Sequence, residues 1–342
     1  MRILVTGHNG YIGSAMTPIL MNAGHQVLGF DSFFFEECSF GSEPIAVPSV
    51  RKDIRDVSEG DLSGFDGVVH LAALCNDPLG NLNPEWTDAI NHVASVRLAR
   101  LARECGVERF LFSSSCSMYG ASASDGLVTE EAPLRPLTPY ATAKVRAEEE
   151  IATLADRDFS PVFLRNATVY GVSARLRADV VLNNLVAWAC TTGQVRVLSD
   201  GSPWRPLVHV EDVARVFLAA LEAPRPAIHN QAFNVGSNAE NYQVRELAEI
   251  VRSVVPGCAV AYSPRPSPDP RSYRVDFDKL ARALPGVAGR HNARLGAKEL
   301  AGAFQGAGLR VEDVEGPRFT RLAQVKRLLA AGALDGSLRW RR

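Results

Sequence analysis

Hydrophobic positions in the first half of the chain follow two alternating patterns. Short apolar and β-branched runs, typical of strands, lie at residues 3–6, 26–30, 46–51, 67–71, 109–113 and 161–165. Between them, apolar positions recur at steps of three and four at residues 11–22, 86–104 and 140–155, which predicts helices. Strands that alternate with helices in this way predict an α/β fold with a doubly wound parallel sheet.

The regularity weakens after Gly171. We expect helices separated by Pro and Gly clusters, notably at residues 263–271. A helix at residues 211–222 and a strand at residues 232–235 are expected to return to the sheet. The predicted domains are therefore interleaved: residues 1–170 with about 209–236 form the sheet domain, and residues 171–208 and 237–342 form a smaller C-terminal substrate domain.

Composition narrows the class of protein. The 342 residues are 46% hydrophobic, enough for a large core, and the formal charge of -1 provides no global field for nucleic acid or an anionic membrane. Six cysteines without a Cys-x-x-Cys pair indicate neither a zinc site nor a disulfide framework, so we predict no metal. The chain opens without a basic-then-apolar leader, and no apolar run reaches the roughly 18–20 residues of a membrane span. We therefore expect a cytoplasmic protein.

A glycine-rich turn follows the first predicted strand and opens the first helix. Gly7 permits the tight turn, Gly10 lets the backbone approach a pyrophosphate, and Gly13 lets helix and strand pack closely. Asp31 ends the second strand about 20 residues later, where a carboxylate would accept from both ribose hydroxyls and repel a 2′-phosphate. The glycines alone would also suit an ordinary strand–helix turn, but with Asp31 they predict a Rossmann-type domain that binds NAD rather than NADP.

A Tyr and a Lys four positions apart indicate the chemistry. Tyr140 and Lys144 fall on one face of a predicted helix, and an ammonium beside a phenol lowers the pKa of the Tyr toward neutrality. Residues 113–115, three serines, lie at the carboxyl end of a strand, where open parallel sheets bind ligands. A hydroxyl there can donate to the oxygen that the Tyr deprotonates. The alternatives are a solvated helix face for the pair and a loop-capping role for Ser113.

Together these motifs resemble the extended short-chain dehydrogenase/reductases. The resemblance also rests on Tyr11 and Ile12 within the glycine-rich turn, on Asp53 and Ile54, and on the His-Leu-Ala-Ala run at residues 70–73. The catalytic residues that it implies are Ser115, Tyr140 and Lys144. The NAD-binding residues that it implies are Gly7, Asn9, Gly10, Tyr11, Ile12, Gly13, Asp31, Asp53, Ile54, Leu71, Ala72, Ala73, Ser113, Tyr140 and Lys144.

Residues 164–171 and 205–212 extend the resemblance to family members that act on nucleotide-diphosphate sugars. The resemblance then covers about residues 1–280 and leaves the tail unassigned. In that group, arginines that match Arg205 and Arg271 bind the substrate diphosphate, which suits the bidentate contacts of a guanidinium; surface arginines beside prolines are the alternative. The implied substrate-binding residues are Ser115, Ser117, Thr168, Asn183, Arg205 and Arg271.

Two departures from the family pattern bear on the reaction. Cys116 and Ser117 stand where sugar dehydratases carry Asp and Glu, and decarboxylases carry Glu at the position of Ser117. Elimination of water needs an acid and a base, so dehydration is disfavoured. The resemblance favours an NAD-dependent nucleotide-sugar epimerase, at C4, and a homodimer formed through the helices at residues 86–104 and 140–155. The alternatives are a dehydrogenase or ketoreductase, an epimerase at another carbon, and a non-catalytic NAD-sensing protein.

Further side chains near the predicted site are candidates for a role in catalysis or in substrate binding. Cys116, next to the catalytic Ser, is a candidate proton carrier at a carbon beside a transient ketone, with a buried structural role as the alternative. Thr168 stands where many family members have a substrate-contacting Asn. We expect Asn166 to point the other way on an extended segment, and Asn183 and Asn184 are candidates to supply amides instead.

Overall fold

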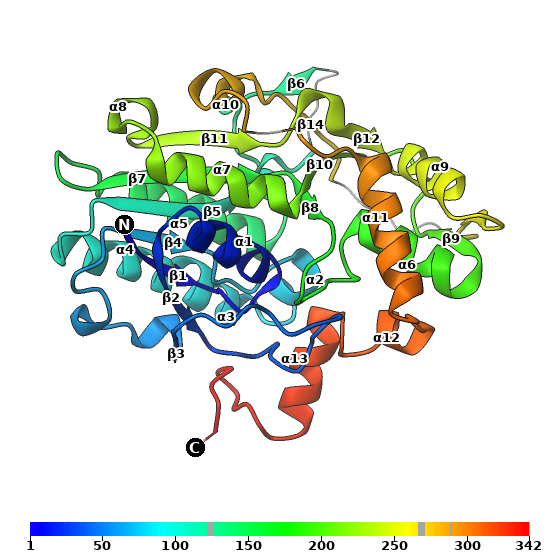
Figure 1. Cartoon of the computed structure of the whole chain (residues 1–342), viewed down its shortest axis with the longest axis horizontal. Helices are drawn as coiled ribbons and strands as arrows, with labels where there is room; N and C mark the ends of the chain where they lie inside the picture. Colours follow the sequence, from blue (N-terminus) through cyan, green and yellow to red (C-terminus); the bar gives the residue numbers. More distant parts are fainter. Residues whose placement is uncertain (122–125, 266–270, 288, 342) are drawn as a thin grey trace.

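A seven-stranded parallel sheet forms the centre of the computed structural model, which describes residues 1–121, 126–265, 271–287 and 289–341 (Figure 1). Its strands are β1 (Arg2–Thr6), β2 (Gln26–Asp31), β3 (Ser49–Arg51), β4 (Gly67–His70), β5 (Arg109–Ser115), β7 (Ser160–Asn166) and β11 (Gln231–Val235). Their spatial order is β11-β7-β5-β4-β1-β2-β3, and each neighbouring pair is parallel. Because the order reverses between β1 and β4, ligands are expected at the carboxyl ends of these two strands. The predicted doubly wound sheet is confirmed.

Helices cover both faces of the sheet. Helices α1 (Tyr11–Asn22) and α7 (Val210–Glu222) lie side by side on one face (Figure 1). The other face is covered by α3 (Pro84–Asp88), α4 (Ala94–Glu104) and α5 (Pro139–Ala152). Side chains of β1 alternate between the two layers: Ile3 and Val5 pack with α1 and α7, whereas Leu4 packs with α4 and α5. Each face therefore has its own apolar core.

Two predicted elements differ in detail from the structure. The helix predicted at residues 86–104 is α3 and α4 joined by a π-helical turn at Ala89–Val93. Within this turn, the buried Asn91 amide accepts from Leu74 N at 2.8 Å and donates to Leu74 O at 2.9 Å, which holds the loop after β4 in place. The strand predicted at residues 46–51 begins only at Ser49, because Pro48 has no N–H for the ladder.

The second part of the molecule has its own core between short sheets and helices. Strands β8 (Thr168–Tyr170), β10 (Trp204–His209) and β12 (Asn241–Gln243) form one sheet, and β9 (Gln194–Val197) pairs with β13 (Ala259–Tyr262). Helices α6 (Val181–Thr192), α9 (Val244–Val254), α11 (Ala293–Gly306) and α12 (Val311–Glu315) pack around them. Smaller elements are α2 (Asp77–Gly80), α8 (Arg225–Ile228), α10 (Asp278–Ala283), and β6 (Leu127–Val128) with β14 (Arg274–Val275). Since α7 and β11 belong to the large sheet domain, the two parts are interleaved in sequence.

The end of the chain returns to the N-terminal half. Helix α13 (Arg321–Ala330) and the residues after it, red in Figure 1, pack near α2 and the loop that follows β2. Trp340 Nε1 donates to Ser32 O at 2.5 Å, and its ring lies 5.8 Å from the ring of Phe34. The predicted division assigned residues 237–342 to the smaller domain; the structure differs because the apolar face of α13 is buried in the core of the sheet domain.

Candidate active site

A cavity of about 730 Å³ lies at the carboxyl ends of β1, β4, β5 and β7 and continues between α6, β9 and β10. It thus connects the glycine-rich turn with the second part of the molecule. Most of the side chains singled out in the sequence line its wall. The predicted residues that do not line it are Asn9, Cys116 and Asn183.

Bare backbone forms the wall at the glycine-rich turn. Gly7 has a φ of 74°, and a Cβ at this position would lie 2.7 Å from Ala72 N. A Cβ on Gly13 would lie 2.3 Å from Gly7 O. A side chain at either position would therefore force the backbone apart. Such a surface at the N-terminus of α1 fits the pyrophosphate of a dinucleotide.

Asp31 closes the glycine-rich turn and also faces the cavity. Its carboxylate accepts from Phe33 N at 2.7 Å and from Asn9 N at 3.0 Å. The remaining lone pairs suit ribose hydroxyls. Asn9 lies behind the turn, where its side-chain oxygen accepts from Arg175 Nε at 2.8 Å. The structure thus gives Asn9 a supporting position.

The start of α5 places Tyr140. Thr138 caps the helix by accepting from Ala141 N at 3.2 Å, and its hydroxyl donates to Asp77 Oδ1 at 2.6 Å. Pro139 occupies the first helical position, where a missing N–H costs nothing. Tyr140 follows in the first turn, and Lys144 lies one turn later on the same face.

Burial dominates the ionisation of this pair. Lys144 Nζ donates to Ser113 O at 2.7 Å and lies 4.5 Å from the centre of the Phe112 ring. Because the ammonium is buried, the pKa of Lys144 is lowered to about 8. Burial also raises the pKa of Tyr140; the nearby Cys75 adds to this effect, and a hydrogen bond with Ser115 opposes it. Burial thus opposes the expected depression of the Tyr140 pKa, because desolvation of the phenolate outweighs the neighbouring charges.

The serine run ends beside Tyr140. The Ser115 hydroxyl donates to Ser117 Oγ at 2.9 Å and accepts from Ser117 N at 3.2 Å, which turns the chain at the end of β5. Ser115 lies beside Tyr140, and its hydroxyl favours the ionised form of the phenol. Ser113 also lines the cavity, and its hydroxyl accepts from Asn166 Nδ2 at 3.0 Å.

Cys116 turns away from the cavity. It is 1% exposed, its Sγ donates to Arg165 O at 3.1 Å, and burial raises the pKa of its thiol. This position supports the structural alternative. A different thiol, Cys75, lines the wall, with Sγ 3.4 Å from Arg177 Nη1. Sequence reasoning missed Cys75 because it lies just beyond the His-Leu-Ala-Ala run.

The amides near β7 also differ from expectation. Asn166 and Thr168 both line the cavity, so the expectation that Asn166 points away is wrong; positions two apart on an extended chain share a side. The buried Oδ1 of Asn166 has no partner among the described residues. Asn183 is fully buried, where it accepts from Gly171 N at 3.1 Å and donates to the Tyr11 hydroxyl at 3.1 Å. Asn184, instead, faces the cavity.

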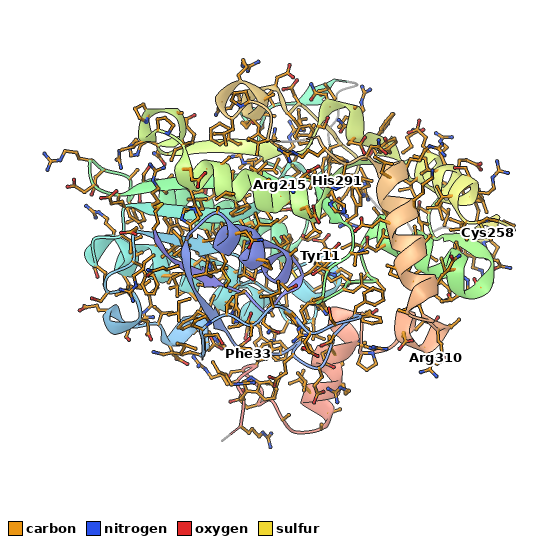
Figure 2. All side chains as sticks on the ribbon, viewed as in Figure 1. Tyr11, Phe33, Arg215, Cys258, His291 and Arg310 are labelled. Atoms are coloured by element: carbon orange, nitrogen blue, oxygen red, sulfur yellow. The ribbon has the colours of Figure 1, made fainter. Side chains whose placement is uncertain are left out.

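Tyr11 joins the two parts of the molecule beside the cavity. It is labelled in Figure 2 at the end of α1 that faces the second part. Its hydroxyl donates to Gly171 O at 2.7 Å, and Asn183 donates to the same hydroxyl. Asn183 therefore supports the cavity wall from behind instead of touching a ligand.

Arginines from distant segments meet in the cavity. Arg205 Nη1 donates to Arg271 O at 2.6 Å, and Arg271 pairs with Asp77. Both predicted diphosphate ligands thus line the same end of the wall. Arg177 and Arg321 line it as well; neither belongs to a motif recognised in the sequence, and Arg321 comes from the unassigned tail.

Residues 3–236 match the sequence model of the NAD dependent epimerase/dehydratase family. The chain belongs to this family. The region matched includes the glycine-rich turn, the serine run, Tyr140 and Lys144, which the structure gathers at one cavity. This epimerase/dehydratase is therefore an NAD-dependent enzyme, and the bare backbone at the glycine-rich turn fits that cofactor.

Individual relatives agree with the family assignment. UDP-glucose 4-epimerase from Corynebacterium glutamicum is 30% identical over 306 residues, which cover 83% of this chain and 90% of the relative. The solved structure of Thermus thermophilus UDP-glucose 4-epimerase in complex with NAD is 26% identical, with a TM-score of 0.73, and the match covers 89% of this chain and 100% of that chain. An NAD-dependent NDP-hexosamine 5,6-dehydratase involved in tunicamycin biosynthesis is 25% identical, with a TM-score of 0.77 and coverage of 89% and 98%.

None of the helices within the described ranges is both long enough and apolar enough to cross a membrane.

Proposed function

We propose that this enzyme is a nucleotide-sugar epimerase that inverts C4 through a transient keto-sugar. The observation that carries the proposal is the convergence of Ser115, Tyr140 and Lys144 at one cavity that also holds the bare glycine-rich turn and two arginines. The cavity extends from the turn to β9 and β10, so a dinucleotide and a sugar nucleotide have separate ends to occupy.

Each catalytic side chain has a distinct role in this proposal. Tyr140 takes the proton of the sugar hydroxyl and later returns it, while Ser115 donates a hydrogen bond to the reacting oxygen. The positive charge of Arg177 favours the phenolate of Tyr140, and Lys144, one turn later on the same helix face, is proposed to position the nicotinamide ribose. Bound NAD supplies the hydride acceptor for the carbon-bound hydrogen and the donor for its return. Since hydride and proton both come back, the net reaction is inversion alone.

The substrate diphosphate is assigned to Arg205 and Arg271. Arg205 lies in β10 and bonds Arg271 O, so both residues line the part of the cavity formed by the second sheet, and planar guanidinium groups suit bidentate phosphate contacts. Between this part and Tyr140, Asn166 and Thr168 face the space where the sugar would lie. The Oδ1 of Asn166, which no group in the described ranges contacts by a hydrogen bond, is proposed to accept from a sugar hydroxyl or from the cofactor carboxamide.

Dehydration is the second reaction to consider, since one structural relative is a dehydratase. Elimination needs a carboxylic acid or another proton donor that is free to act on the leaving hydroxyl. Of the described lining residues, the acidic ones are Asp31, Asp53, Asp77 and Asp179. Each is held by backbone N–H groups, by an arginine, or by both. These contacts favour epimerisation, which requires no additional acid.

The epimerase proposal is tested by stereochemistry. Purified enzyme is incubated with a panel of UDP- and dTDP-sugars, and the products are followed by NMR. We expect a C4 epimer without net change in NAD. We expect Tyr140→Phe to reduce turnover by about 100-fold or more, since a positioned acid–base group contributes 10²–10⁴-fold. Tyr262→Phe, at a half-exposed position outside the cavity, is the matched control and should keep full activity.

Two other outcomes would overturn the proposal. A stoichiometric release of NADH with a keto-sugar product would identify a dehydrogenase. An unsaturated or 4-keto-6-deoxy product would identify a dehydratase. In either case the family assignment and the cofactor would stand.

We also propose that the enzyme forms a homodimer through α4 and α5. The support is the family resemblance of these helices, and light scattering coupled to gel filtration tests it directly. The cytoplasmic location stays a prediction from the sequence.

A further inference from the structure

Two buried arginines, Arg177 and Arg321, line the cavity outside every recognised motif. Arg177 is 7% exposed and lies between β8 and α6, whereas Arg321 is 1% exposed and is the first residue of α13. They come from segments far apart in sequence, and both reach the same wall. Burying a guanidinium is costly unless its N–H groups are paired, so their contacts indicate what the wall is built for.

Each guanidinium has one buried nitrogen that no described residue pairs with. Arg177 donates from Nε to Asp179 Oδ1 at 2.8 Å and from Nη1 to Cys75 Sγ at 3.4 Å, while Nη2 has no partner in the described structure. Arg321 donates from Nη2 to Arg175 O at 2.6 Å, and Nη1 has none among the same described residues. Both nitrogens are buried within residues that line the cavity, so the wall holds hydrogen-bond donors that none of the described groups satisfies.

The local charge is also unbalanced. Asp179 is the carboxylate between the two arginines, and Asn76 Nδ2 donates to it at 2.7 Å. Burial lowers the pKa of Arg321, and the neighbouring charge of Arg177 lowers it further. Two guanidinium groups against one carboxylate leave a net positive charge in a buried wall. A bound anion would offset that charge.

The position along the cavity identifies the anion. The Arg321 guanidinium lies 4.4 Å from the ring centre of Phe35, in the segment that follows Asp31 at the ribose end. Arg177 lies beside Cys75 on the Tyr140 side, and its backbone oxygen is held by Asn183, which also bonds Tyr11. The pair therefore lies between the ribose end and the reacting end. In a dinucleotide, this middle part is the doubly charged pyrophosphate.

We propose that Arg177 and Arg321 bind the pyrophosphate of NAD from the side opposite the glycine-rich turn. Helix α13 then completes the cofactor site, with backbone N–H groups of the turn on one side of the phosphates and two guanidinium forks on the other. This arrangement gives the C-terminal segment a direct role in holding the cofactor. The proposal rests on the use of NAD and not on the identity of the sugar.

The test compares Arg321→Met and Arg177→Met with Arg327→Met. Arg327 lies on the same helix as Arg321 but is half-exposed and bonds Gln324 and Glu37 outside the cavity. The first readout is the amount of NAD bound per chain as purified. The second is calorimetric titration of the NAD-depleted protein with NAD, ADP-ribose, adenosine and UDP. We expect affinity for NAD and ADP-ribose to fall about 10- to 100-fold in the two cavity variants, as for loss of a charge-assisted hydrogen bond, with adenosine and UDP unchanged.

Other results would overturn the proposal. Unchanged affinity for NAD and ADP-ribose in folded Arg321→Met would show that the arginines do not contact the pyrophosphate. A loss confined to UDP would assign them to the substrate diphosphate instead. Near-UV circular dichroism checks folding, and if Arg321→Met fails to fold, Arg177→Met and Arg321→Lys carry the same ligand comparison. Failure of epimerase activity on all sugars would refute the proposed function while leaving these binding results intact.

Discussion

At the scale of single residues, the direction of each side chain decides what the cavity wall contains. Ser115 and Cys116 are adjacent, yet the hydroxyl meets Tyr140 and the thiol bonds Arg165 O, because the chain turns sharply at the end of β5. Motif matching predicted the positions of Ser115 and Tyr140, but it could not tell which neighbour faces inward. Cys75 follows Leu74, which Asn91 anchors through two hydrogen bonds, and no local sequence pattern indicates this contact.

The buried His70 leads to a prediction of how the stability of the folded protein depends on pH. It is fully buried between Thr6 Oγ1 at 2.6 Å and Ser95 Oγ at 2.8 Å, and burial lowers its pKa to about 3, with Lys144 adding to the effect. The folded protein thus keeps His70 neutral while the unfolded chain protonates it near pH 6.5. The stability linked to His70 is fully present above pH 6.5 and is lost as the pH falls toward 3.

Urea unfolding at several pH values measures this effect. Between pH 6.5 and 4, we expect the free energy of unfolding of the native protein to fall by about 1.4 kcal/mol per pH unit more than that of His70→Asn. The variant is expected to be less stable at neutral pH. The comparison therefore uses only the slope of the free energy of unfolding against pH, not its absolute value. Equal slopes for the two proteins would contradict the assigned pKa.

At the scale of elements, the packing of helix α11 depends on one close contact, between Gly296 and the ring of Tyr170. A Cβ on Gly296 would lie 2.1 Å from the ring of Tyr170, at the end of β8. That ring is 5.3 Å from the ring of His209, which stacks on His291 at 3.9 Å; His291 is labelled at the start of α11 in Figure 2. The helical period predicted elements of the first half well. The position of α11 against β8 depends on this tertiary contact, which the hydrophobic periodicity of the sequence does not reveal.

The matched pair Gly296→Ala and Gly302→Ala tests this packing within one helix. Gly302 has no atom within 4 Å of an added Cβ, so Gly302→Ala should stabilise the protein by about 0.5–1 kcal/mol through helix propensity. Gly296→Ala should destabilise it by about 1–3 kcal/mol, because Tyr170 must move within a packed core. Denaturant unfolding gives both values. Similar effects of the two substitutions would show that α11 adjusts freely.

At the scale of the whole molecule, the interleaved chain path ties both ends to one sheet domain. The return of α7 and β11 to the sheet could be predicted because their patterns match those of the first half. The docking of α13 could not be predicted, because an amphipathic helix does not specify its partner. Its partners are Phe34 and other residues of the loops after β2 and β3, and they are visible only in the folded chain.

Trp340 is the last anchor of the tail, and its removal tests the docking. Trp340→Ala deletes the hydrogen bond to Ser32 O and the ring contact with Phe34, and since the side chain is only partly buried we expect a loss of about 1–3 kcal/mol. Limited trypsin digestion followed by mass spectrometry should show faster cleavage after Lys326 and Arg327. Trp340→Phe retains the ring contact and is the control. Equal cleavage rates in all three proteins would show that α13 is held without this anchor.

The strand order has a consequence for the growing chain. Strand β11 is the last strand of the large sheet to be synthesised, and it pairs with the edge of β7. Until Gln231 to Val235 have left the ribosome, β7 presents unpaired backbone groups beside the apolar residues Val162 and Leu164. During synthesis, the enzyme therefore passes through a stage in which the edge of its central sheet is open to pairing with other chains.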